Sequence, residues 1–156
     1  MGFSQSMALF TEFTVIKTKD GCRMFRAPIA QIDSLRNKKC DLGTCKKVNL
    51  SVPSENVFVL NRNQDARISI GSAGFFYDAQ KNRITTSSGK ECEIYSEGDL
   101  AVRVFADRNS VEIYIQNEIV MSFSLNPEWM EIETDKDTAV TRYELKSIWD
   151  EDADRH

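Results

Sequence analysis

Hydrophobic and polar positions alternate along most of the chain, in short runs separated by turn-forming residues. In residues 111–116 the odd-numbered positions are Val, Ile and Ile, and the even-numbered positions are Glu, Tyr and Gln. Residues 119–125 alternate in the same way. A period of two predicts a strand with one face on a core and the other on water or a second surface. Strands repeated at this spacing over residues 11–149 predict an all-β fold, a two-sheet antiparallel β-sandwich of the lectin-like jelly-roll kind.

Turn-forming residues mark the ends of the predicted strands. Residues 19–21 (Lys-Asp-Gly) separate the first two runs, as expected of a hairpin with glycine at positive φ. Ile29, Ile32 and Leu35 lie three apart, which predicts one amphipathic turn or a short helix. Residues 37–47 are polar and predict a loop. The predicted strands are residues 12–18, 22–28, 48–52, 56–60, 67–70, 75–78, 83–86 and 91–95, the two runs that flank residues 107–110, and residues 119–125 and 140–149.

Composition limits the partners and the location. The chain has 156 residues, enough for one domain with a substantial core. A net charge of −4 argues against nucleic acid, because phosphate binding needs clustered Lys and Arg, and the basic positions in residues 36–47 are interpreted as a solvated loop. No run approaches the roughly 18 apolar residues that span a membrane. Residues 1–10 lack the pattern of a signal peptide, which leaves the location open and slightly favours the cytoplasm.

The four cysteines do not form a recognisable metal site. Cys40 and Cys45 are separated by four residues, wider than a zinc knuckle, and no histidine lies near them. These two cysteines either close a small disulfide loop or remain free thiols. Free thiols are the favoured interpretation, since Cys22 and Cys92 occupy ordinary strand positions.

One pair of carboxylates suits catalysis. A retaining glycosidase uses two carboxyl groups about 5–5.5 Å apart, and Asp107 and Glu112 could approach each other across the turn at residues 107–110. The favoured interpretation is a structural turn, because Asp and Asn accept backbone N–H groups there. No cofactor, metal or histidine-assisted nucleophile is expected, since His156 is the only histidine and the last residue, and no glycine-rich phosphate loop is present.

Phe76 and Trp129 are candidate sugar contacts, because the C–H faces of a sugar pack on aromatic rings. Phe76 belongs to a run of three aromatic residues, so at least one of the three points outward from a strand. An ordinary position in the core or over a sheet is the favoured alternative for each of the two residues.

Residues 102–118, VRVFADRNSVEIYIQNE, resemble the hairpin near the end of the glycoside hydrolase family 32 enzymes, which are invertases, levanases and sucrose-6-phosphate hydrolases. The family pattern is a hydrophobic strand, Asp-Arg-Ser-Ser-Val-Glu, a second hydrophobic strand and Asn-Asp-Gly-Glu. Asn109 replaces a frequent Ser, and the following turn lacks the usual Gly. The residues that match the motif are Asp107, Arg108, Ser110, Val111 and Glu112.

The likeness extends over residues 2–149. Residues 6–36 are similar to the segment that enters the C-terminal domain of the family, residues 74–86 to its Tyr-Asp strand pair, and residues 143–149 to its closing strand. At residues 10–12 this chain has Phe-Thr-Glu where the family usually has Pro-Arg-Glu, so contacts between domains are expected to differ there.

The resemblance implies that this chain carries no catalytic residues. In the family, catalysis belongs to an N-terminal five-bladed β-propeller with an Asn-Asp-Pro-Asn-Gly motif, an Arg-Asp-Pro motif and a Glu-Cys pair. The first two motifs are absent here. The pair Glu91-Cys92 matches the third by letters alone, because it falls inside the predicted sandwich, and we reject it as the acid/base.

The resemblance also implies an organisation and a set of partners. Residues 1–10 are expected to be an entry segment from a missing propeller, residues 11–149 the β-sandwich, and residues 150–156 a frayed acidic tail. The implied function is a non-catalytic accessory domain of a β-fructosidase that stabilises the propeller, in cis or in trans, and that contributes to a homodimer. A stand-alone module that binds a fructoside is the alternative, and a glycosidase complete in this chain is the least favoured hypothesis.

Overall fold

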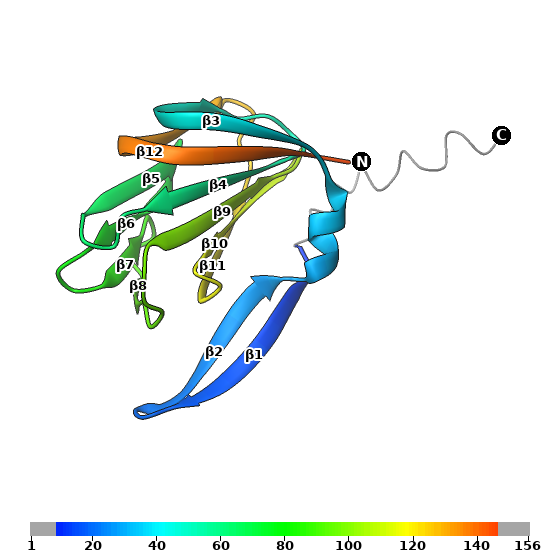
Figure 1. Cartoon of the computed structure of the whole chain (residues 1–156). Coiled ribbons are helices and arrows are strands. Elements are labelled where there is room, and N and C mark those ends of the chain that lie inside the picture. Colours follow the sequence, from blue (N-terminus) through cyan, green and yellow to red (C-terminus); the bar gives the residue numbers. More distant parts are fainter. Residues whose placement is uncertain (1–8, 147–156) are drawn as a thin grey trace.

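The computed structural model describes residues 9–146, which form twelve β-strands and one short 3-10 helix, η1 (Figure 1). The predicted entry segment up to residue 8, Trp149, the acidic tail and His156 lie outside the described residues. The bounds are β1 Thr11–Thr18, β2 Gly21–Pro28, η1 Ala30–Leu35, β3 Arg36–Asn49, β4 Ser54–Leu60, β5 Ala66–Ile70, β6 Ala73–Asp78, β7 Arg83–Thr86, β8 Glu91–Glu93, β9 Leu100–Ala106, β10 Ser110–Ile115, β11 Ile119–Ser124 and β12 Glu131–Leu145.

Strands β3 to β12 form two antiparallel layers that share the long strands β3 and β12. The C-terminal half of β12 pairs with β4, and the layer continues through β9 and β10 to β11. The N-terminal half of β12 pairs with β5, and that layer continues through β6 and β7 to β8. β3 runs along the other side of β12. The two-sheet antiparallel fold predicted from the alternation is therefore confirmed.

The main core fills the space between the two layers. Its side chains come from the alternate inward positions of the strands, as the period of two predicts. Burying a Val, Leu, Ile or Phe side chain contributes roughly 1.5–3 kcal/mol, so these positions dominate the stability of the sandwich. Members that are fully excluded from solvent are Phe58, Ile68, Ile70, Tyr77, Ile84, Leu100, Val102, Val104, Ile113, Ile115 and Ile132.

A second, smaller core lies on the outer face of the β4–β9–β10 layer. The helix η1 packs Ile32 against the rings of Phe105 and Tyr114 on this face. The two rings meet edge to face, with centroids 5.7 Å apart. The amphipathic turn predicted from Ile29, Ile32 and Leu35 is confirmed as η1, and its apolar side covers the outer face of the sheet.

β1 and β2 form a two-stranded hairpin, here called the arm (residues 11–28), outside both layers. The arm continues below η1 (Figure 1), and β2 contacts the sandwich: the N–H of Arg26 donates to the carbonyl of Asn117 at 2.5 Å, and the rings of Phe25 and Tyr95 meet edge to face. Its register is unbroken from Thr11↔Pro28 to Thr18↔Gly21, and Gly21 has φ of 127° at the turn. Six consecutive residues of β1, from Glu12 to Lys17, are exposed. The arm is thus a hairpin whose outer strand has little contact with the rest of the chain.

Two sequence-based predictions about the long strands are wrong. Residues 37–47 were expected to be a loop and 48–52 a strand, but β3 covers Arg36–Asn49. The last strand was expected to begin at residue 140, but β12 begins at Glu131. Most of β3 is exposed on both faces, so it shows no hydrophobic alternation, and backbone pairing with β12 forms the strand instead. Register shifts between Glu133 and Thr138 obscure the period in β12.

No helix among residues 9–146 is long and apolar enough to cross a membrane.

Candidate functional site

The family-like motif lies in the hairpin between β9 and β10. The backbone N–H of Asp107 donates to the carbonyl of Ser110 at 2.9 Å, which closes the turn. The carboxylate of Asp107 accepts the N–H of Arg108 at 2.7 Å, and the side chains of both residues are exposed. The carbonyl of Asn109 accepts the N–H of Leu125, so the turn is also tied to the end of β11. Asp107 therefore bonds to the turn that contains it.

Glu112 lies on the outer face of β10, and its side chain is buried, with 4% of the residue exposed. One carboxylate oxygen accepts the backbone N–H of Leu9 at 2.7 Å, and the other accepts the hydroxyl of Tyr114 at 3.1 Å. The Tyr114 hydroxyl also lies 2.9 Å from the hydroxyl of Thr11. Glu112 and Tyr114 thus fasten the residues where the chain enters the arm to the outer face of the sheet.

Burial raises the pKa of Tyr114 to about 12. The hydrogen bond with Thr11 lowers this pKa, whereas the charge of Glu112 and the hydrogen bond to it raise it. The neutral phenol is favoured because a phenolate would be buried next to a carboxylate. Tyr114 is therefore expected to stay protonated throughout the physiological range and to donate to Glu112.

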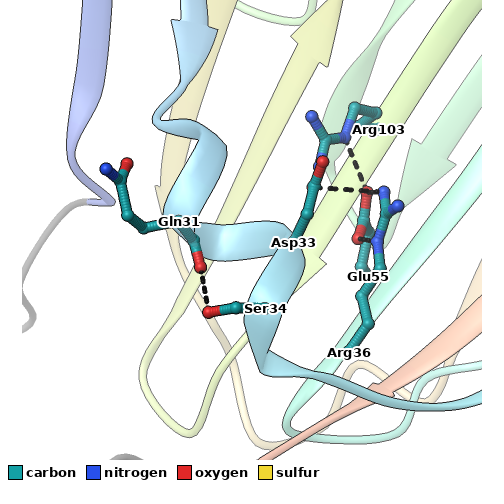
Figure 2. Close-up of polar contacts among 6 residues, drawn as sticks. All are labelled: Gln31, Asp33, Ser34, Arg36, Glu55 and Arg103. Atoms are coloured by element: carbon teal, nitrogen blue, oxygen red, sulfur yellow. Dashed lines mark hydrogen bonds and ion pairs between the residues drawn. The ribbon is translucent and has the colours of Figure 1, made fainter.

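A second buried carboxylate, Glu55 on β4, joins three elements (Figure 2). Arg36, at the start of β3, donates to both carboxylate oxygens from Nε and Nη2 at 2.8 Å each. Arg103 on β9 donates from Nε at 2.6 Å and from Nη2 to Asp33 of η1 at 2.9 Å. Glu55 is completely buried. The cluster, here called the Glu55 clamp (Asp33, Arg36, Glu55 and Arg103), ties η1 and β3 to the β4–β9 pair.

The two arginines of the clamp also stack on aromatic rings, which suits the planar guanidinium group. The guanidinium carbon of Arg36 lies 4.0 Å from the ring centroid of Tyr143, and that of Arg103 lies 5.0 Å from that of Phe105. The hydrogen bonds with Glu55 raise the pKa of Arg36, although burial opposes this shift. Both guanidinium groups are therefore held between Glu55 and an aromatic ring.

These carboxylates have a structural role, because their hydrogen bonds join different elements of the fold. Each oxygen of Glu55 and Glu112 accepts a hydrogen bond from a guanidinium, a backbone amide or a hydroxyl. Asp107 is engaged in its own turn, so Asp107 and Glu112 bond to different partners. A glycosidase acid must instead reach the leaving oxygen of a bound sugar. Residues 9–146 contain no group of three or more His, Cys, Asp or Glu that could hold a metal ion.

The pair Glu91-Cys92 lies on the short strand β8. Glu91 is exposed and accepts a hydrogen bond from Arg83 at 2.9 Å. Cys92 is half-buried and packs against the main core, and the four cysteines are all free thiols in the structure. The free-thiol interpretation is the one that the geometry supports.

The two aromatic candidates have different surroundings. Phe76 is half-buried, and the guanidinium carbon of Arg67 lies 5.7 Å from its ring centroid. Trp129 is half-buried and packs closely over Gly71, where a Cβ would lie 2.1 Å from the indole nitrogen. Trp129 also lines a shallow groove of about 460 Å³, and Phe76 does not. The other residues that line this groove are Ser72, Ala73, Ser87, Ser88, Ser122, Phe123 and Ser124.

The Glu55 clamp cannot be recognised in the sequence. Its members are far apart in the chain, with Glu55 and Arg103 separated by 48 residues and Arg36 and Glu55 by 19. A signal was available, because Arg103 occupies an outward position in a strand that was predicted correctly. The partner of that arginine depends on the strand order, which a single sequence does not give.

No protein-family model matches the chain, and no curated protein matches its sequence. Solved structures match its fold. Exo-inulinase from Aspergillus awamori superposes with a TM-score of 0.65 and 13% identity, over 91% of this chain and 36% of the enzyme. Sucrose-6-phosphate hydrolase from Lactobacillus gasseri superposes with a TM-score of 0.62 and 19% identity, over 86% of this chain and 33% of the enzyme. Fructan 1-exohydrolase IIa from Cichorium intybus superposes with a TM-score of 0.56 and 6% identity, over 86% of this chain and 40% of the enzyme.

The chain is therefore a β-sandwich whose fold corresponds to between one third and two fifths of each of these enzymes. The resemblance to family 32 enzymes that the sequence predicts is confirmed at the level of the fold.

Replacing Glu55 with Gln tests the clamp. The change leaves two arginines on the outer face of the sheet without their shared carboxylate, and breaking a buried ion pair in this way costs about 3 kcal/mol or more. We expect the free energy of unfolding in urea to fall by that amount. The control is Glu144→Gln, because Glu144 is exposed and lies 3.9 Å from Lys38; a change within about 0.5 kcal/mol is expected there. Equal losses for the two variants would contradict the clamp.

The pKa of Tyr114 gives a pH prediction. The folded value of about 12 exceeds the ordinary value of 10, so its contribution to stability is present below pH 10 and is lost as the pH rises towards 12. Absorbance at 295 nm should show a tyrosine that ionises near pH 12, and Tyr114→Phe should remove it. A Tyr114→Phe titration that matches the native one at every pH would show that Tyr114 is not buried against Glu112.

Proposed function

We propose that the chain is a non-catalytic accessory β-sandwich of a fructoside-hydrolysing enzyme, and that its arm packs against a separate catalytic unit. The observation that carries this proposal is the fold match, which covers nearly the whole of this chain but only about a third of exo-inulinase and of sucrose-6-phosphate hydrolase. The remaining length of those enzymes has no counterpart among the residues compared. A partner, in cis or in trans, would supply the chemistry.

The bonding of the carboxylates supports this proposal. Glu55 and Glu112 hold η1 and the entry to the arm, so the acidic residues that fit a glycosidase by type have structural partners. Asp107 bonds within an exposed turn. The same contacts fix the base of the arm relative to the sheet, which an accessory domain needs if the arm is to meet a partner in a constant orientation.

Exposed apolar residues of the arm, together with Phe10 directly before it, support a docking role. Phe10 is 70% exposed, Phe13 is 62% exposed, and Met24 is 47% exposed. Apolar side chains gathered on an exposed hairpin are typical of an interaction surface. The departure from Pro-Arg-Glu at residues 10–12 adds Phe10 to this surface, so the partner would present apolar side chains opposite it.

Copurification from the native cells tests the accessory role. We expect the tagged chain to bring down a hydrolase, or to be covalently continuous with one, so that the eluate releases fructose from sucrose or inulin. The double change Phe10→Ser and Met24→Ser should lower this activity at least tenfold when the catalytic unit is a separate chain, while Val59→Ser, at an exposed valine outside the arm, should leave it unchanged. Fructose release by the recombinant chain alone, abolished in Glu112→Gln, would contradict the proposal.

A second candidate function is binding of a fructoside in the groove beside Trp129. Its motivation is the lining, in which five serine hydroxyls accompany an indole ring, since sugars pack C–H faces on aromatic rings and hydrogen-bond to hydroxyls. Both layers contribute, through β6 and β11. This function could accompany the accessory role.

Calorimetric titration with sucrose, inulin fragments and levan fragments tests the sugar groove. Binding should weaken at least tenfold in Trp129→Ala, provided that the variant keeps its cooperative unfolding, and should be unchanged in Phe76→Ala, because Phe76 lies outside the groove. Absence of heat with all three ligands would exclude this function and leave the accessory role standing.

A further inference from the structure

The outer edge of β1 is unpaired. Among the described residues, β1 pairs only with β2, and Figure 1 shows β1 on the side of the arm that faces away from the sandwich. The backbone N–H and C=O groups along that edge can therefore accept another strand. Six of its residues, 12–17, are exposed, so no part of the described chain covers the edge.

The edge of β1 lacks the features that protect the other long edge strand. β3 carries Lys38, Lys39, Lys46 and Lys47, and its pairing with β12 is interrupted by register shifts. Lysines and bulges are the usual means of preventing edge-to-edge pairing. β1 has one lysine, no register shift, and a central run of Phe, Thr, Val and Ile, which favour strands. The contrast shows that the β1 edge is suited to pairing.

Three exposed apolar residues of the arm, Phe13, Val15 and Met24, share one face. Val15 pairs with Met24 across the hairpin, so their side chains lie on the same side, and Phe13 lies two residues from Val15 on that side. Phe13 and Val15 are 62% and 61% exposed. This apolar face would become wider if the β1 strand of a second copy, with the same residues, paired alongside it.

We propose that a second copy of this chain pairs with the β1 edge in an antiparallel, two-fold symmetric arrangement centred on Thr14. The pairing uses the backbone edge of β1, whereas the proposed docking to a catalytic unit uses exposed side chains of the arm, so the two can be tested separately. A two-fold axis perpendicular to the sheet leaves the same face of both arms on the same side of the joined sheet. Side chains alternate between the two faces along a strand, so two residues that face each other must both be odd-numbered or both be even-numbered.

Two symmetric registers overlap most of the strand, centred on Thr14 or on Val15. Centring on Thr14 places Phe13 opposite Val15 of the second copy, twice by symmetry, and Thr14 opposite Thr14. An aromatic residue facing a β-branched residue is a favourable cross-strand pair. Centring on Val15 instead places Phe13 opposite Lys17. The first register joins the two apolar faces into one band, and for that reason we assign it.

The charges of β1 agree with antiparallel pairing of two copies. Its charged residues are Glu12 near one end and Lys17 near the other. In the Thr14 register Glu12 faces Ile16 of the second copy and Lys17 faces Thr11, so no two like charges face each other. Parallel pairing in register would place Glu12 beside Glu12 and Lys17 beside Lys17, and like charges side by side destabilise a sheet.

Disulfide trapping tests the register. In a background with the four native cysteines changed to Ala, and with folding verified by cooperative unfolding, Thr14→Cys should oxidise to a covalent dimer, because facing Cα atoms lie about 4.5–5.5 Å apart. Val15→Cys should crosslink at least tenfold more slowly, since the two positions 15 would be roughly 8 Å apart, beyond the reach of a disulfide of about 7 Å. Equal rates, or faster crosslinking through Val15→Cys, would overturn the assignment.

Sedimentation velocity of the unmodified chain provides a second test that needs no cysteine replacement. The native chain should show reversible dimerisation, and Val15→Lys should raise the dimer dissociation constant at least tenfold, because lysine faces Phe13 of the second copy at two symmetric positions. Val59→Lys is the matched control, since Val59 is 47% exposed and lies on β4. A strictly monomeric native chain at high concentration, or equal effects of the two changes, would overturn the proposal and leave the accessory role untouched.

Discussion

The arrangement outside the sandwich depends on one completely buried carboxylate, Glu55, held between two guanidinium groups. A charge removed from water is tolerated only when partners satisfy it, and here the partners come from different elements. Arg36 begins β3, Arg103 belongs to β9, and Asp33 extends the network into η1. The position of η1 on the sheet therefore depends on satisfying this carboxylate.

Glu112 extends the same principle to the other side of η1. It accepts the amide of Leu9, while Tyr114 shares its hydroxyl between Glu112 and Thr11. Together the two carboxylates surround the small apolar core of Ile32 and Phe105. The outer face of a β-sandwich usually meets water, but here it holds a second packed layer that orients the arm. The acidic residues that suggest chemistry in the sequence thus determine geometry in the structure.

The sequence predicts the features that arise from alternation. Strands such as β7 and β10, the hairpin at residues 19–21 and the turn around Ile32 follow from local periodicity and turn chemistry. β3 was missed because an edge strand exposed on both faces has no periodic signal. The Glu55 clamp was missed because it depends on which strands are neighbours, and the order β9-β4-β12 joins segments far apart in the chain. The local pattern of residues predicts the strands and turns, whereas an ion pair between distant segments can be predicted only when the order of the strands in the sheet is known.

Residue-resolved amide hydrogen exchange of the unmodified chain tests most directly whether the buried carboxylates hold the segments outside the sandwich in place. The N–H of Leu9 donates to Glu112 and lies before the first strand, so no sheet hydrogen bond contributes to its protection. The account predicts that this amide exchanges at least about a hundredfold more slowly than an unstructured amide, as expected of a bond that opens only with the surrounding structure. Exchange of Leu9 at the unprotected rate would contradict it.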